Sequence, residues 1–215
     1  MSVIMVVKVS KNRYVQMAIK NSKKDVSKTM ANKKTRAVTL EEYKELISTI
    51  ENGFLSYEPN PRVAMALRLE ANLGIRIEDI LSLRPVDIVW DYDRYRLDIT
   101  EKKTGKKRTF VVAKKIVDYI KKYCAIHCIP KDMPIIPISE RMVQRQLALA
   151  ADYLGYENIG THSFRKFFAT ALYRDTLDPV LVQNILQHAS VETTRRYIGI
   201  ENRQIEEALE RHIVL

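Results

Sequence analysis

The sequence predicts a mainly α-helical fold that carries one small three-stranded antiparallel β-sheet. Two observations favour this fold class. Apolar residues recur at helical spacing over most of the 215 residues, and capping residues, prolines and glycines mark the ends of the segments. Between residues 86 and 112 the apolar pattern changes to a period of two, which is typical of half-buried strands. A chain of this length can bury one substantial core, with or without an appendage.

The composition is that of an ordinary globular protein, with 46% hydrophobic and 29% charged residues. No apolar run approaches the roughly 18 residues of a membrane span. The first ten residues lack a long apolar region and a small-residue cleavage site. We therefore expect neither a signal peptide nor a membrane partner.

The net charge of +10 is concentrated at the N-terminus. Residues 1–36 hold ten lysines and arginines against Asp25 alone, which gives this segment +9 and leaves +1 for the other 179 residues. We interpret residues 1–36 as a basic arm or linker that contacts nucleic acid, with Lys33, Lys34 and Arg36 at its end. A solubilising tail is the alternative.

Two helices are predicted after the basic arm. Residues 39–42 form a capping box, and a helix follows to about Ile50. The Asn-Pro pair at residues 60–61 begins a second helix, which is apolar on much of its surface and should be central and buried. Gly74 interrupts it, and Arg76 follows at once. Arg76 is either a surface residue at a helix start or a partly buried arginine with a function.

A three-stranded meander is predicted after Pro85, which ends the helical pattern. The predicted strands lie at residues 86–90, 95–99 and 109–111, and the two turns between them lie at residues 91–93 and 103–106. The second turn is basic, and its cluster consists of Lys102, Lys103, Lys106, Lys107 and Arg108. Such a hairpin tip can enter a DNA groove and deliver one lysine to a phosphate. Alternatively, the charges only prevent pairing at an exposed sheet edge.

Two further helices are predicted, at residues 116–126 and from Ser139 to about residue 154. The prolines between them predict a loop at residues 129–138. The two cysteines, Cys124 and Cys128, lack a second ligand cluster for zinc, and we expect them to be buried free thiols.

The most informative stretch is residues 161–200, which reads as helix, break, helix, turn and helix. Asp178 before a proline and Ser190 are the predicted N-caps of its second and third helices. The polar residues lie near the helix ends, so they can converge on one anionic group. They are His162, Arg165, His188 and Tyr197.

These residue types suit phosphate chemistry. Two guanidinium groups, from Arg76 and Arg165, match the oxygens of a phosphodiester in its transition state. Histidines can donate hydrogen bonds or move protons, and a tyrosine can form a covalent phosphotyrosine. We expect no metal and no other cofactor, because the arginines supply the positive charge that magnesium would otherwise supply.

Five segments in this order resemble the catalytic domain of the tyrosine recombinases, or phage integrases. The segments are TLEEYKEL, GIRIEDILSLRPVDI, EKKTGKKRTFVV, THSFRKFFAT and ILQHASVETTRRYIGI. The resemblance covers residues 37–200, and it implies the tyrosine recombinase catalytic-domain fold. It also implies an enzyme that cuts and rejoins DNA through a 3′-phosphotyrosine.

The resemblance assigns roles to the basic residues of the site. Arg76 and Arg165 match the two arginines that clamp the phosphate. Lys103, which precedes Thr-Gly in the hairpin turn, matches the general acid for the 5′-hydroxyl leaving group, and Lys102 is its competitor. Asp79 matches an acidic residue that orients the site.

The remaining catalytic positions lie in the last third of the chain. His162 matches the first residue of the His-x-x-Arg motif, His188 matches the later histidine or tryptophan position, and Tyr197 matches the nucleophile. Gln187 departs from the family pattern, which usually has glycine directly before the position of His188.

The resemblance also implies a domain organisation. Family members usually carry a helical core-binding domain of about a hundred residues before the catalytic domain. Here we expect only the basic arm at 1–36, no full core-binding domain, and a catalytic domain at 37–215. Residues 201–215 should form an amphipathic helix, which packs either on its own core or, as in the family, on a neighbouring subunit.

We therefore expect a site-specific DNA recombinase of the integrase or invertase type, from a mobile element. Its expected partners are double-stranded DNA, further copies of itself in a tetramer on paired sites, and a DNA-bending accessory protein. The expected location is the cytoplasm, at the nucleoid when the protein is bound to DNA. Two alternatives remain open: a DNA-binding regulator on the same scaffold, and a topoisomerase-like enzyme that nicks and rejoins DNA.

Overall fold

The computed structural model describes residues 35–199 and 210–212. The chain divides into two units, residues 1–34 and 35–215, and only the second contains described residues. Most of the predicted basic arm, including Lys33 and Lys34, therefore lies outside the described residues. The predicted helix at 201–215 lies outside them too, apart from residues 210–212.

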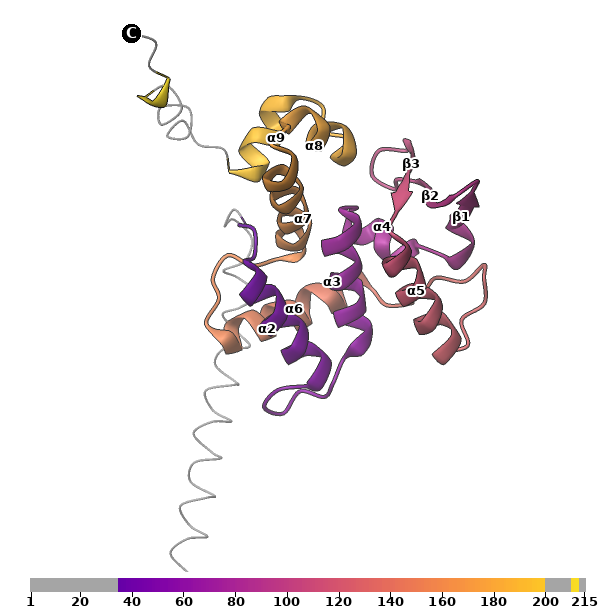
Figure 1. The fold of residues 1–215 in the computed structure, drawn as a ribbon. Helices are drawn as coiled ribbons and strands as arrows, with labels where there is room; N and C mark the ends of the chain where they lie inside the picture. The colour runs from indigo at the N-terminus through magenta and orange to yellow at the C-terminus, as the bar shows by residue number, and fades with distance from the viewer. Residues whose placement is uncertain (1–34, 200–209, 213–215) are drawn as a thin grey trace, which may run out of the picture. The chain divides into compact units, whose positions relative to one another are not determined.

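Helices dominate the described residues, and the strands form one three-stranded antiparallel sheet, which confirms the predicted fold class (Figure 1). In chain order the elements are α2 (Leu40–Asn52), α3 (Pro61–Leu73), α4 (Ile77–Ser82), the 3-10 helix η1 (Pro85–Asp87), β1 (Ile88–Asp91), β2 (Arg94–Thr100), β3 (Lys107–Val112), α5 (Lys114–Ile126), α6 (Glu140–Leu154), α7 (Thr161–Thr176), α8 (Pro179–Leu186) and α9 (Val191–Ile198). None of the helices that the structure describes is both long and apolar enough to span a membrane.

The central helix of the main hydrophobic core is α3, as predicted. Its N-terminus is capped by Asn60, whose side chain accepts a hydrogen bond from the Val63 amide at 3.2 Å, and proline follows as the first helical residue. The helix contacts α2, α4, α6 and α7, which lie around it in Figure 1. Because it is surrounded, nine of the thirteen residues of α3 are buried.

The predicted capping box at the start of α2 is confirmed. Thr39 donates its amide to a Glu42 carboxylate oxygen at 2.8 Å, and the Glu42 amide donates to the Thr39 hydroxyl at 3.2 Å. Arg36 pairs with the same carboxylate and also donates to the carbonyl of Glu157. Arg36, predicted as the end of the basic arm, is therefore held against the start of α2 and the residues that follow α6.

The sheet has the strand order β1-β2-β3, with Ile88 opposite Leu97 and Leu97 opposite Phe110. The fully buried Leu97 anchors its inner face on the core. The prediction that Val86 begins the first strand is wrong. Residues 85–87 form a turn of 3-10 helix before the strand, in which the Ile88 amide donates to the carbonyl of Pro85, and the Val86 amide donates to the carbonyl of Lys131 at 3.0 Å.

Strand β3 is present, but the residues on which its prediction was based, Thr109 and Val111, lie on its exposed face. Thr109 and Val111 are exposed, whereas Phe110 and Val112 pack on the core. The alternation continues back to Arg108, whose side chain is 3% exposed. The period of two therefore turns this arginine inward, away from the exposed tip of the hairpin.

The two cysteines are free but not both buried. Cys124 is half-buried in α5, while Cys128 is exposed just beyond the helix, where its φ of 52° turns the chain. The prediction of buried thiols is therefore wrong for Cys128. Among the described residues no group of three His, Cys, Asp or Glu side chains is placed to hold a metal.

The predicted order of helix, break, helix, turn and helix is confirmed for α7, α8 and α9. The Asp178 side chain accepts from the amides of Val180 and Leu181 at 2.8 and 3.0 Å, and Ser190 accepts from the Thr193 amide at 3.1 Å. These three helices share a small core of their own, formed by Ala169, Val182, Leu186 and Ile198.

We expect Gly74→Ala to destabilise the domain more than replacement of a helix-cap glycine whose added Cβ would meet open space. Gly74 ends α3 with a φ of +60°, and an added Cβ would lie 2.2 Å from a ring carbon of Phe168 in α7. The left-handed backbone and the overlap together should cost roughly 2–4 kcal/mol of unfolding free energy. Urea denaturation measures this loss.

Gly155→Ala is the matched control for that variant. Gly155 caps α6 with a φ of +75°, but an added Cβ there meets nothing within 4 Å. It should lose only the backbone part, about 1–2 kcal/mol. Equal losses in the two variants would show that contact with Phe168 has no part in the effect.

Candidate active site

The six predicted catalytic side chains come from separate segments and converge. They are Arg76 at the N-cap of α4, Lys103 in the β2–β3 turn, His162 and Arg165 in α7, His188 in the α8–α9 turn and Tyr197 in α9. The charges of both arginines act on the pKa of both histidines and of the tyrosine. The rings of His188 and Tyr197 lie 4.9 Å apart. The structure therefore gathers these residues into one site.

Arg76 is held by an acidic residue that the sequence reasoning missed. One guanidinium nitrogen of Arg76 lies 2.5 Å from a carboxylate oxygen of Glu101, whose side chain has no exposed surface. The Gly74 cap of α3 turns the chain so that Arg76 begins α4 and reaches across to the hairpin. Arg76 is thus a partly buried, paired arginine and not a surface residue at a helix start.

Arg165 is almost completely buried at 2% exposure. Its Nη2 donates to the carbonyl of Leu186 at 2.8 Å, which ties α7 to the last turn of α8. Its Nη1 is buried and has no hydrogen-bond partner among the residues that the structure describes. A buried guanidinium with an unused donor is poised to bind an anion.

His188 and Tyr197 form the ring pair beside Arg165. The rings meet edge to face, and the Nδ1 of His188 lies 2.9 Å from the hydroxyl of Thr194. Burial and the charges of nearby arginines, first of all Arg165, lower the pKa of His188 to about 4. The imidazole is therefore neutral at physiological pH, and Thr194 fixes its orientation.

The hydroxyl of Tyr197 is protonated in the free protein. Burial raises the pKa of this phenol to about 12, although the guanidinium of Arg165 acts in the opposite direction. The ammonium of Lys166 lies 5.4 Å from the centre of the ring. The phenol oxygen can therefore attack a bound phosphodiester only after it has lost its proton.

His162 and Lys103 lie at the open side of the site, where both residues are exposed. Partial desolvation, followed by the charges of Arg165 and Lys103, lowers the pKa of His162 below its usual value. Because the charge of Lys103 acts on His162, the hairpin turn and the start of α7 lie near each other.

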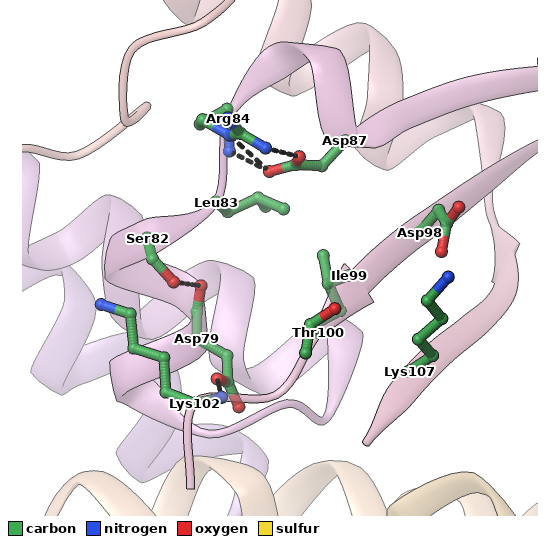
Figure 2. Close-up of a pocket in the computed structure, with 10 residues that line it drawn as sticks. All are labelled: Asp79, Ser82, Leu83, Arg84, Asp87, Asp98, Ile99, Thr100, Lys102 and Lys107. Carbon is green, nitrogen blue, oxygen red and sulfur yellow. Dashed lines mark hydrogen bonds and ion pairs between the residues drawn. The ribbon is translucent and has the colours of Figure 1, made fainter. Parts of the chain in front are cut away.

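Asp79 anchors the base of that hairpin. Its Oδ1 accepts the Lys102 amide at 2.9 Å, while its Oδ2 is buried without a hydrogen-bond partner in residues 35–199 and 210–212. Burial raises the pKa of Asp79, although the Lys102 amide works against this. Figure 2 shows that the Lys102 ammonium points away from the Asp79 carboxylate, along the wall of a pocket of about 480 Å³. Lys103, by contrast, is among the charges that lower the pKa of His162, which favours Lys103 as the catalytic lysine.

The residues predicted to contact DNA are placed differently from one another. Lys102, Lys106 and Lys107 are exposed on and beside the hairpin turn, as a DNA-contacting tip requires. Arg108 is buried and paired with Glu101 at 3.2 Å. Its predicted place at the exposed tip is therefore wrong, because the strand turns it inward. Lys33 and Lys34 lie outside the described residues.

Two buried acids near the site were missed, although the sequence carries a signal for each. Glu101 continues the inward-facing alternation of Leu97 and Ile99, so the period of two already placed it on the buried face. Glu70 is the one acidic residue of α3, it lies among apolar residues on the buried side of this helix, and it is completely buried. Neither carboxylate oxygen of Glu70 has a hydrogen-bond partner in the part of the chain that the structure describes.

We expect Glu70→Gln to stabilise the domain at neutral and alkaline pH. Burial raises the pKa of Glu70 well above its usual value, although Arg165 acts against this. Because the folded-state pKa lies above the unfolded one, wild-type stability is full at acidic pH and falls as the pH rises. The glutamine variant should gain about 1–3 kcal/mol over wild type at pH 8 and little at pH 4.

Urea denaturation between pH 4 and pH 8 measures this difference. Glu41→Gln, at an exposed position in the first turn of α2, is the matched control and should show no such rise. A stability difference for Glu70→Gln that stays constant over the whole pH range would contradict the expectation.

A helical domain with a small sheet and a cluster of two arginines, two histidines and a tyrosine is typical of proteins that break and rejoin phosphodiester bonds through a tyrosine. The chain belongs to the phage integrase family, whose family model matches residues 36–203. This membership confirms the family resemblance and the catalytic-domain fold that the sequence predicts.

Named relatives agree with this assignment. The probable integrase/recombinase YoeC of Bacillus subtilis is 37% identical over 141 residues, which cover 60% of this chain and 73% of that protein. The pre-cleavage complex of the XerH site-specific recombinase with its difH substrate has a TM-score of 0.62 and 22% identity, over 85% of this chain and 56% of that chain.

A third match is the lambda integrase tetramer bound to a Holliday junction. Its TM-score is 0.59 at 21% identity, over 78% of this chain and 49% of that chain. At these identities the two structural matches show a shared fold. The chain spans about half the length of each of these two recombinases.

Proposed function

We propose that this protein is a site-specific DNA recombinase that cuts and rejoins DNA through a 3′-phosphotyrosine. One observation carries the proposal: next to Tyr197, the buried Arg165 has a donor, Nη1, without a hydrogen-bond partner among the described residues, in a site that also gathers Arg76 and His188. Membership of the phage integrase family supports the same reaction.

In the first step the Tyr197 oxygen bonds to the phosphorus and the bond to the 5′ oxygen breaks. The phenol proton passes to a neutral imidazole or to water, and the leaving 5′ oxygen takes a proton from Lys103. Arg76 and Arg165 hold the nonbridging oxygens as their charge grows. The 5′-hydroxyl of the partner strand then attacks the phosphotyrosine and releases Tyr197.

Binding of the phosphodiester should itself raise the pKa values of His162 and His188. The nearby guanidinium charges help to lower the pKa of His162 and of His188. A phosphate anion between the arginines would offset those charges, so the ability of the imidazoles to accept a proton rises when the substrate is in place. The site therefore becomes more basic only when DNA fills it.

The proposed partners are double-stranded DNA and further copies of the chain. XerH is bound to difH DNA and lambda integrase is a tetramer on a Holliday junction, which supports a tetramer on paired sites here. In this proposal residues 201–215 form the helix that docks on a neighbouring subunit, and a DNA-bending protein assists assembly. The reaction takes place in the cytoplasm, at the nucleoid.

The test is an assay with paired DNA sites taken from the flanks of the gene. Wild-type protein should form a denaturant-resistant DNA adduct on a nicked suicide substrate and yield recombinant strands from two intact sites. Adduct with relaxation of supercoils but no recombinant strands would favour the topoisomerase-like alternative. Binding without any adduct would favour the DNA-binding regulator.

We expect deletion of residues 1–34 to weaken DNA binding and to flatten its dependence on salt. This segment holds nine of the ten basic residues of the predicted arm, and each phosphate contact that it loses removes about 0.9 from the slope of log K against log salt. Fluorescence anisotropy between 50 and 200 mM salt measures both quantities. Unchanged affinity and slope would mean that the arm is a passive tail.

A further inference from the structure

We propose that Glu101 and Arg108 are positioning residues that lock the hairpin carrying Lys103 to the end of the helix that precedes His188. This inference rests on the proposed function, because it assigns a task to two residues that the chemistry does not use. Neither residue has a role in the mechanism described above, and both are almost completely buried.

A chain of contacts starts at the phosphate-binding arginine. Glu101 holds Arg76 through one carboxylate oxygen at 2.5 Å and Arg108 through the other at 3.2 Å. The Thr104 hydroxyl donates to the first of these oxygens at 2.9 Å. Lys103 lies between Glu101 and Thr104, so the hydrogen bond from Thr104 to the Glu101 carboxylate closes the turn around Lys103.

The chain of contacts continues from Arg108 into α8. The second guanidinium nitrogen of Arg108 donates to the carbonyl of Ile185, and Arg165 donates to the carbonyl of Leu186 at 2.8 Å. These carbonyls belong to the last turn of α8, where no further turn of the helix supplies donors and where positive charge is favoured. Two arginines from different segments thus hold two successive carbonyls.

The same junction has a third connection. The Gln187 amide group donates to the carbonyl of Lys107, the residue before Arg108, at 3.3 Å. Gln187 adopts a left-handed backbone with a φ of 54°, and His188 follows directly. The hydrogen bond from Gln187 to β3 therefore bears on the position of the adjoining His188 and, through the ring contact of His188, on Tyr197.

The burial of this network explains why it should be rigid. One carboxylate compensates two guanidinium groups, and its removal would leave buried charge without a partner. Burial works to raise the pKa of Glu101, but the Thr104 and Arg76 hydrogen bonds hold it below its usual value. Burial lowers the pKa of Arg108 to about 10, so the arginine remains charged at neutral pH. All charges of the network are therefore present when the enzyme works.

Arg108→Met tests this inference by removing the charge while keeping much of the side-chain volume. Single-turnover cleavage of a saturating suicide substrate should slow by about 10- to 100-fold, because misplacement of catalytic groups by about 1 Å is enough for such a loss. The Kd for DNA should change less than about twofold, because Arg108 lies inside the domain. Arg108→Lys, which keeps the charge but reaches one partner, should lose less.

The outward-facing Arg96 provides the matched control. It lies on β2 and pairs with Asp91, so Arg96→Met removes the same group from the same hairpin without touching the network. Its cleavage rate should equal that of wild type. Glu101→Gln combined with Arg108→Met should be little slower than the slower single variant, because residues that act as one unit are not additive.

Amide hydrogen exchange gives a second measurement that needs no DNA. The amides of Gln187 and His188 donate to the carbonyls of Asn184 and Gln183 at 3.2 and 3.1 Å. In Arg108→Met they should exchange at least about tenfold faster, while those of α3 stay unchanged. Faster exchange throughout the domain would indicate general destabilisation and overturn the inference, as would wild-type exchange together with a wild-type cleavage rate. If wild-type protein forms no adduct on any DNA, the proposed function fails, and exchange still decides whether Arg108 holds α8.

Discussion

Tyr197→Phe should bind DNA with wild-type affinity and form no covalent adduct. The substitution removes only the hydroxyl that attacks the phosphorus, so the edge-to-face contact with His188 and the packing on the small core of α7, α8 and α9 are retained. The expected loss of adduct is complete, because no other group of the site can replace the phenol oxygen. Denaturing gel electrophoresis on a nicked suicide substrate measures it.

Tyr173→Phe is the matched control for that experiment. Tyr173 packs against the same small core and also loses one hydroxyl, but it precedes α8 and lies outside the predicted catalytic set. It should form adduct at the wild-type rate. An adduct in Tyr197→Phe would reassign the nucleophile, and its loss in both variants would point to damage of the shared core.

Elements with local signals could be predicted from the sequence. The capping box at Thr39, the Asn-Pro start of α3 and the caps at Asp178 and Ser190 each depend on hydrogen bonds within four residues, and all are present. The order of the catalytic motifs along the chain was equally readable. Their convergence on one site follows from the family fold rather than from spacing alone.

What could not be predicted depends on contacts between distant segments. Arg108 was placed at the exposed tip because it continues a run of basic residues, whereas its partners in the fold are Glu101, directly after the neighbouring strand β2, and the carbonyl of Ile185, 77 residues further along the chain. Arg36 resembles the basic residues before it, yet its guanidinium is taken up by Glu42. Charge counts along a segment do not reveal such pairing.

Gln187, which stands where the family usually has glycine, illustrates both what the sequence reveals and what only the structure reveals. Its φ of 54° lies in the left-handed region, which explains why glycine is usual at this position. The side chain here gains a compensating hydrogen bond to the carbonyl of Lys107 across the hairpin. The sequence revealed the departure, and only the fold reveals the contact that offsets part of its cost.

Arg165→Ala should lose roughly 10² or more in the rate of DNA cleavage, by comparison with the loss of one donor to a developing oxyanion. The variant loses the unused Nη1 donor, and it also loses the Nη2 hydrogen bond that holds the Leu186 carbonyl. Arg165→Lys should fall between wild type and alanine, since one ammonium cannot replace a guanidinium that binds in two directions. Single-turnover cleavage measures both variants.

Arg174→Ala is the matched control, because Arg174 lies on the same helix but is exposed in its last turn. It should cleave at the wild-type rate. Arg165 also lies beside the buried Glu70, so its removal should raise the pKa of that carboxyl further and favour its protonated form. Adding Glu70→Gln to Arg165→Ala should therefore restore stability without restoring cleavage. Recovery of cleavage in the double variant would mean that Arg165 acts by neutralising Glu70 and that its contact with the phosphate is dispensable.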